Sequence, residues 1–215
     1  MKTLGFLFIV VLSICGCKKP VDLYATVTFQ QTDIPITTGS YWVYSHHSSH
    51  DFSNVTDDTI IMKISYVENF TPNRKILHYI LLDNYMGLID SSIGILTIDS
   101  FIYYSVTNQD LLGNYKLTLP FNYKKEWIGN DTRDSFRVID YFDRYSVNPL
   151  DYMYVFEIHS QYYQSSGIVN QSGIKRINDI LVAKGIGIIQ KSRQQDSTGT
   201  VGTNALFTLV KYHIE

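Results

Sequence analysis

The sequence predicts an all-β domain, an antiparallel sandwich or (half-)barrel of about ten strands. Apolar and polar residues alternate with a period of two along several segments, as they do in half-buried strands. No stretch shows a sustained helical period. Clusters of Gly, Pro, Asn, Asp and Ser separate the alternating segments. Consecutive strands without intervening helices favour antiparallel pairing.

The expected strands follow one another along the chain. The alternation is strongest in residues 59–67, 94–106, 115–121, 152–162 and 206–214. Weaker candidates are residues 41–45, 76–82, 136–142, 179–183 and 187–193. The chain has 17 tyrosines, a residue type that packs well on half-buried pleated surfaces. Tyrosine also suits interfaces, and we favour the structural role on half-buried strands.

Two segments of the chain echo each other. Pro35 and Pro120 each stand between apolar residues, and each is followed seven residues later by a tryptophan, Trp42 and Trp127. These are the 2 tryptophans of the chain. Proline cannot donate to a strand ladder, so it would mark a strand entrance. The match predicts a degenerate two-fold repeat, with coincidence in a strand-rich chain as the alternative.

Residues 1–16 have the layout of an export signal. Lys2 precedes an apolar run over residues 4–14. That run is too short for a transmembrane helix, which needs roughly 20 residues. A short basic start followed by an apolar core of this length is typical of a secretory signal. We expect these residues to be removed.

The end of the signal, Ile14-Cys15-Gly16-Cys17, resembles the lipobox of bacterial lipoproteins. Cys17 fits better than Cys15, because small Gly16 precedes Cys17 whereas bulky Ile14 precedes Cys15. The resemblance implies a diacylglyceryl thioether on Cys17, usually with an acyl chain such as palmitate on its amine. Two or three chains make a stable anchor where one binds only marginally. Membrane lipid is thus the expected partner of Cys17. Lys18, where Asp often retains lipoproteins in the inner membrane, favours the outer membrane, with the leaflet left open.

Two further motifs resemble a loose family of uncharacterised Gram-negative envelope lipoproteins. The opening motif is Pro-x-x-x-Gly-x-x-Trp-x-Tyr, here residues 35–44, and the closing motif is Gly-[Val/Ile]-Gly-apolar, here residues 185–188. The resemblance implies an exported all-β domain and no established activity, so no functional residue is transferred. A Gly usually precedes the second Trp, and Lys124-Lys125 stands there instead, which weakens the repeat.

The expected organisation is a cleaved signal at 1–16, a lipidated cysteine and tether at 17–33, and one all-β domain at 34–215. With Cys15 removed and Cys17 acylated, the 2 cysteines leave none for a disulfide, a thiolate metal site or a cysteine nucleophile. The 18 Lys and Arg against 20 Asp and Glu show no basic stripe. Nucleic acid is therefore not an expected partner.

The one histidine cluster, residues 46–51, is a weak metal candidate. His46 and His50 would share a face of a strand, with Asp51 nearby. A closed zinc site needs four ligands and a catalytic one three, so we favour a solvated hairpin tip and expect no metal. Asp57-Asp58 is likewise interpreted as a solvated turn.

No residue is singled out as catalytic and no cofactor is expected. Gly185-Ile186-Gly187 lacks the third glycine and the helix of a dinucleotide site, and is better explained as a bulge or tight strand entry. A Gly-x-Ser-x-Gly elbow is missing. A dispersed catalytic triad stays open, but nothing indicates one.

Three functions remain. The favoured one is a membrane-anchored envelope lipoprotein that serves as a non-catalytic binding or assembly module. The second is carriage of a lipid or other apolar ligand in a β-cavity. The third is a glycan-binding or glycan-acting surface protein that uses exposed tyrosines. The protein or glycan partner is not identified by the sequence.

Overall fold

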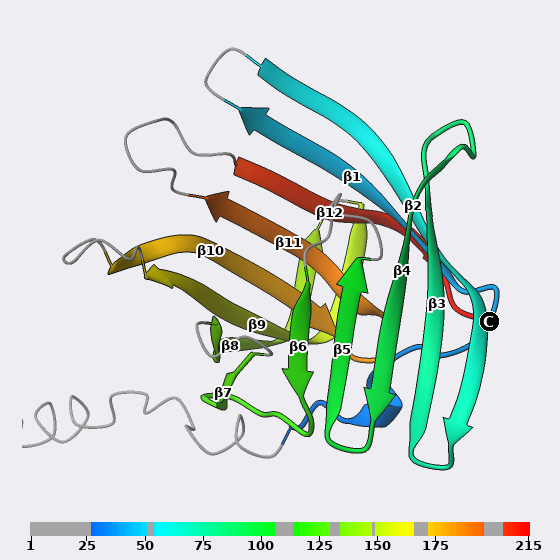
Figure 1. The fold of residues 1–215 in the computed structure, drawn as a ribbon, viewed down its shortest axis with the longest axis horizontal. Helices are drawn as coiled ribbons and strands as arrows, with labels where there is room; N and C mark the ends of the chain where they lie inside the picture. The colour runs from blue at the N-terminus through cyan, green and yellow to red at the C-terminus, as the bar shows by residue number, and fades with distance from the viewer. Residues whose placement is uncertain are drawn as a thin grey trace, which may run out of the picture.

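The computed structural model describes residues 27–50, 54–105, 114–129, 134–147, 149–165, 172–195 and 204–215. The signal and Cys17 lie outside them. The described residues hold one 3-10 turn and twelve strands (Figure 1). Their bounds are η1 (Gln31–Asp33), β1 (Tyr41–His50), β2 (Asn54–Thr71), β3 (Arg74–Leu82), β4 (Leu88–Thr97), β5 (Ser100–Ser105), β6 (Tyr115–Thr118), β7 (Glu126–Ile128), β8 (Asp134–Val147), β9 (Leu150–Ser165), β10 (Ser172–Ala183), β11 (Gly187–Gln195) and β12 (Asn204–His213).

The strands form one antiparallel sheet in the order β6-β5-β4-β3-β2-β1-β12-β11-β10-β9-β8-β7. Consecutive strands pair with each other except β6 and β7, and the pairing of β1 with β12 joins the two halves of the chain. The sheet curves into a nearly closed barrel whose edges are β6 and β7 (Figure 1). The predicted all-β class is confirmed, in its barrel form and with twelve strands rather than about ten.

The two edges of the sheet approach each other through Trp127. Its indole Nε1, on β7, donates to the carbonyl oxygen of Lys116 on β6 at 2.7 Å. Phe121, in the connection between these strands, forms an isolated bridge with Phe29. The two rings stack with centroids 4.8 Å apart. Residues 27–33, which we assigned to the tether, are therefore packed onto the sheet.

The interior of the barrel is rich in aromatic side chains, and the hydroxyl groups of two buried tyrosines are hydrogen-bonded to backbone carbonyls. The hydroxyl of Tyr44 donates to the carbonyl of Ile188 at 2.9 Å, and that of Tyr152 to the carbonyl of Leu209 at 3.2 Å. Burial raises the pKa of Tyr152 to about 12. It also raises the pKa of three further interior tyrosines, Tyr44, Tyr79 and Tyr115. These four side chains stay neutral and serve as core.

Little space remains among these aromatic rings. A cavity of about 40 Å³ lies between the two halves of the inner wall. Its lining includes Trp42, Tyr44, Tyr79, Tyr103 and Tyr115. A water molecule needs about 10–15 Å³ of such volume, whereas small-molecule pockets span roughly 300–1,000 Å³. The cavity among these aromatic rings is thus too small for a small-molecule ligand.

The two tryptophans occupy corresponding strands. Trp42 lies in β1 and Trp127 in β7, each the first strand of a six-strand half of the sheet, and both are buried. Their hydrogen bonds differ, because Trp42 donates to Ile186 in the β10–β11 turn and Trp127 donates to Lys116 in β6. The strand positions of the two tryptophans agree with the predicted repeat. The carbonyl groups that accept their hydrogen bonds do not lie at equivalent positions in the two halves.

Gly185 and Gly187 form the tight entry to β11. Their φ angles are +72° and +98°, and a Cβ at either position would meet nothing within 4 Å. Backbone conformation rather than space therefore requires glycine here. The predicted tight turn is confirmed. Among the described residues, no helix is long and apolar enough to cross a membrane.

Candidate functional site

A row of outward-facing side chains crosses one half of the barrel. The strand register aligns Glu126, Arg137, His159, Asp179 and Ser192 on neighbouring strands from β7 to β11. Arg137 Nε lies 3.3 Å from Glu126 Oε1, and His159 Nδ1 lies 2.7 Å from Asp179 Oδ1. Cross-strand pairs of this kind stabilise a sheet modestly. Here they also hold polar groups in a fixed order.

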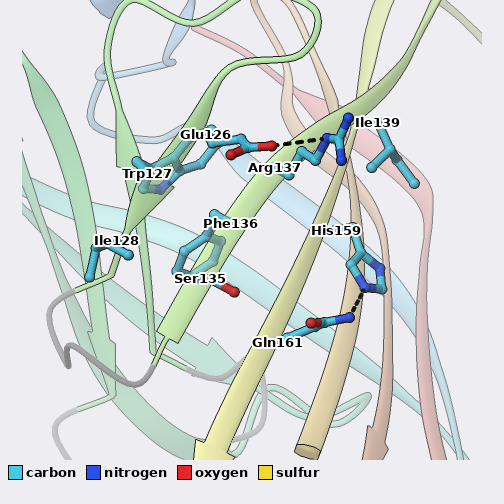
Figure 2. A pocket seen from close by; sticks show the side chains of 9 residues that line it. All are labelled: Glu126, Trp127, Ile128, Ser135, Phe136, Arg137, Ile139, His159 and Gln161. Carbon is cyan, nitrogen blue, oxygen red and sulfur yellow. Dashed lines mark hydrogen bonds and ion pairs between the residues drawn. The ribbon is translucent and has the colours of Figure 1, made fainter.

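The β7 end of this row borders a groove of about 490 Å³ on the outer surface. Figure 2 shows the side chains around it, which come from β7, β8 and β9. They are Glu126, Trp127, Ile128, Ser135, Phe136, Arg137, Ile139, His159 and Gln161. The volume lies within the usual range for ligand pockets. The lining combines hydrogen-bonding groups with exposed apolar side chains.

Strand register brings the groove residues together. Ser135 pairs directly with Gln161, and Arg137 with His159. The register of β8 against β9 then shifts between Val138 and Asp140, which leaves Ile139 as an extra residue. A bulge of this kind redirects side chains. Its effect falls after Ile139, which keeps the outward parity of Ser135 and Arg137 and is exposed at the rim of the groove (Figure 2).

His159 is oriented from both sides. Its Nδ1 faces Asp179, and the amide Nε2 of Gln161 lies 3.0 Å from its Nε2 (Figure 2). Gln161 donates to this nitrogen when the ring carries its proton on Nδ1. Ser192 Oγ donates to Asp179 Oδ2 at 3.4 Å. The hydroxyl thus lies on the carboxylate side of the pair, whereas a catalytic serine lies at the far nitrogen of the histidine. The contacts fix the orientation of the imidazole ring.

Glu157, two residues before His159, carries an electrostatic cost. Burial raises the pKa of its carboxyl, and the carboxylates of Asp179 and Asp140 raise it further. An acid whose pKa is higher in the folded state binds its proton more tightly there than in the unfolded chain. The folded state is therefore penalised as pH rises through the folded pKa.

We expect Glu157→Gln to stabilise the domain at neutral and alkaline pH, because the neutral amide avoids this cost. The gain should vanish in acid, below the pKa of the unfolded carboxyl. Urea denaturation of both proteins across this pH range measures it. A wild-type protein that is more stable than the variant at pH about 8 would contradict the assignment.

The histidine cluster divides between the two faces of β1. His46 points inward, where its Nδ1 lies 2.8 Å from Asp58 Oδ1 and its ring stacks on Phe207 at 4.3 Å. His47 points outward and lies 2.6 Å from Asp57 Oδ1. The predicted solvated tip is wrong for His46, which is buried in a strand. The predicted turn at Asp57-Asp58 is wrong too, because both residues lie in β2.

The metal candidates stay partly untested. The side chain of His50 and the whole of Asp51 lie outside the described residues. Among the residues that the structure describes, no group of three or more His, Cys, Asp or Glu could hold a metal ion. Metal binding by His46, His50 and Asp51 therefore stays a weak and untested hypothesis.

Sequence reasoning missed the residues of the groove and one buried cation. Arg137 lies on β8, and His159 and Gln161 lie on β9. The sequence indicates which face of its own strand each residue occupies, but not which residues of the two strands are neighbours. Lys191 points inward and is 3% exposed, with its Nζ 5.5 Å from the centroid of the Tyr115 ring. A cation over an aromatic face is a favourable contact. No pattern in the segment 187–193 separated this lysine from its solvated neighbours.

The comparisons with known proteins give distant likenesses. No family model matches the sequence, and no curated protein matches it. A presumed lipoprotein from Parabacteroides distasonis is 10% identical with a TM-score of 0.46, over 86% of this chain and 99% of its own. A presumed exported protein with a YmcC-like fold from Bacteroides fragilis is 11% identical with a TM-score of 0.49, over 87% and 100%. A LolA superfamily protein from Nitrosomonas europaea is 4% identical with a TM-score of 0.34, over 86% and 89%.

Proposed function

We propose that this protein is an envelope lipoprotein, anchored through acylated Cys17 at the outer membrane, and that its all-β domain is a non-catalytic binding module. The groove over β7, β8 and β9 is its binding site. The anchor is supported by the lipobox-like sequence at 14–17. The observation that carries the binding role is the groove itself, a hollow of about 490 Å³ with hydrogen-bonding and apolar groups.

The chemistry of the groove fits a polypeptide segment. Ser135, Arg137 and Gln161 offer donors and acceptors, and Ile128 and Ile139 offer apolar contacts. Backbone amides and mixed side chains of a peptide match such a set. β7 is also an edge strand of only three residues, Glu126–Ile128. A peptide lying in the groove would run beside this edge.

The two other functions have less support. An apolar ligand in the barrel would need several times the 40 Å³ found among the interior aromatic rings. Glycan binding relies on exposed aromatic faces, and the two aromatic rings of the groove, Trp127 and Phe136, are only 8% and 5% exposed. A peptide therefore suits the groove better than a sugar.

We expect Ser135→Tyr to block the groove, because Ser135 stands in its lining between Ile128 and Gln161. The matched control is Thr208→Tyr on β12, outside the groove lining. Peptides selected from a random phage-displayed library on the wild-type protein should lose about tenfold or more in affinity for Ser135→Tyr. They should bind the control like wild type.

Calorimetry on the selected peptides, with melting curves for both variants, gives the readout. Equal affinity for wild type and Ser135→Tyr would place the binding elsewhere and defeat the assignment. An oligosaccharide array that binds wild type and loses binding with Ser135→Tyr, while no peptide is selected, would change the ligand class to glycan.

A further inference from the structure

The anchored end of the chain enters the domain at one end of the barrel. Phe29 bridges Phe121, with backbone hydrogen bonds of 2.8 and 3.0 Å. Lys184 Nζ donates to the carbonyl of Thr28 at 2.9 Å and lies 3.3 Å from Asp33 Oδ2. These contacts hold the entering segment at the end of the barrel where the β6–β7 and β10–β11 connections lie. The antiparallel order places the β2–β3 and β4–β5 hairpins at this end too.

Two exposed apolar side chains mark these hairpins. Phe70 is 60% exposed at the end of β2, and Ile98 is 68% exposed between β4 and β5. The hairpins are neighbours, because Arg74 pairs with Thr97 across β3 and β4. The opposite end carries exposed apolar side chains too, namely Tyr85, Met86 and Leu88 at the β3–β4 loop. Exposure alone does not select an end, so the choice rests on where the anchored chain enters the domain.

The tip of the β4–β5 hairpin and the entering chain border the same hollow. Ile98 and Pro120 line a hollow of about 210 Å³ together with Gln30, Gln31 and Thr32. Ten residues, 17–26, separate this entry from the proposed lipid anchor. Fully extended, they reach at most roughly 35 Å. The anchor therefore holds the η1 end of the domain within roughly 35 Å of the bilayer.

The charges around the tips suit a bilayer interface rather than its core. The guanidinium carbon of Arg74 lies 5.2 Å from the centroid of the Phe70 ring. An arginine beside an aromatic ring can bury its stem while its charge faces lipid headgroups. A hydrogen bond from Thr97 lowers the pKa of Asp99, next to Ile98. The negative charge of Asp99 disfavours deep insertion of the β4–β5 tip into the hydrocarbon core of the bilayer.

We infer that the hairpin tips carrying Phe70 and Ile98 insert into the interface of the bilayer that holds the acyl anchor. The inference rests on the proposed anchoring at Cys17. The barrel then stands with its η1 end on the membrane, and the opposite end of the strands points away. The outer groove opens to the side, where a partner can reach it.

Two matched cysteine positions at opposite ends of β3 test this orientation. Asn73→Cys lies in the β2–β3 tip, and Asn84→Cys lies in the exposed β3–β4 loop (Figure 1). Each full-length, lipidated variant carries an environment-sensitive NBD dye on its new thiol. The proteins are reconstituted in phosphatidylethanolamine and phosphatidylglycerol vesicles with or without a brominated lipid quencher.

The dye at position 73 should lose most of its emission to the quencher, and the dye at position 84 should lose almost none. Adding Phe70→Ser and Ile98→Ser to Asn73→Cys should reduce the quenching severalfold, while the protein still sediments with the vesicles. Equal, weak quenching at both positions in sedimenting protein would overturn the inference and leave the anchor intact. The dye at position 73 could also show the same emission with no vesicles present as on vesicles without quencher. That result would mean that protein rather than lipid surrounds the dye, and it would also overturn the inference. Protein that does not sediment would overturn the anchor and the inference together.

Discussion

Cys17→Ser is expected to abolish incorporation of labelled palmitate into the protein, whereas Cys15→Ser is expected to leave it unchanged. The proposed acyl chains depend on the sulfur and the new amine of Cys17. Each buried CH₂ contributes about 0.8 kcal/mol to membrane binding, so two or three chains hold the protein firmly. Cys15 serves as the control because the proposed cleavage removes it with residues 1–16.

The measurement is growth of cells expressing each variant with labelled palmitate, followed by purification of the protein. The mass of the purified wild-type chain gives a second readout, which should lack residues 1–16 and carry the lipid. Label retained by Cys17→Ser and lost with Cys15→Ser would move the anchor two residues upstream. Label absent from the wild-type protein would refute the lipoprotein assignment.

Phe156→Ala is expected to cost about 3–5 kcal/mol of unfolding free energy, the usual loss for a buried phenylalanine. Phe156 is fully buried in β9. Its ring meets Phe121 edge-on at 5.3 Å, Phe29 edge-on at 6.1 Å and Tyr141 at 5.0 Å. It therefore joins the entering segment, the β6–β7 connection and β8.

Met153→Ala on the same strand is the matched control, because Met153 is largely exposed. Its change should stay within about 0.5 kcal/mol. Urea unfolding of the three proteins compares them. A Phe156→Ala midpoint close to that of wild type would show that the packing around Phe29 and Phe121 does not support the barrel.

The fold class follows from the sequence because alternation depends on each strand alone. The segment 152–162 lies inside β9, and its alternation correctly places Tyr152, Phe156 and Ile158 in the core. The alternation fails at Tyr154, which has a φ of +54° and is exposed, while Val155 is buried in its place. The short strand β7 is different, because three residues, Glu126–Ile128, are too few to show a period. The count of about ten strands falls short of twelve partly for this reason.

The groove depends on relations between strands, which no single segment reveals. Arg137 and His159 become neighbours through the register of β8 and β9. The histidine cluster shows the same limit. His46 and His47 looked equally polar, but strand parity buries His46 against Phe207 and exposes His47. The polar character of the segment correctly predicted an exposed His47, but it did not predict that His46 is buried.

Isoleucine methyl NMR tests the account's central claim, that ligands bind in the outer groove and not in the barrel. Ile128 and Ile139 report on the groove, and Ile64, Ile158 and Ile180 report on the buried core. The titrant is a peptide selected from the random library. We expect the methyl signals of Ile128 and Ile139 to shift on saturation, with those of the core unchanged. Shifts in the core methyls with Ile128 and Ile139 unmoved would mean that the barrel interior opens to take the ligand, and would contradict the account.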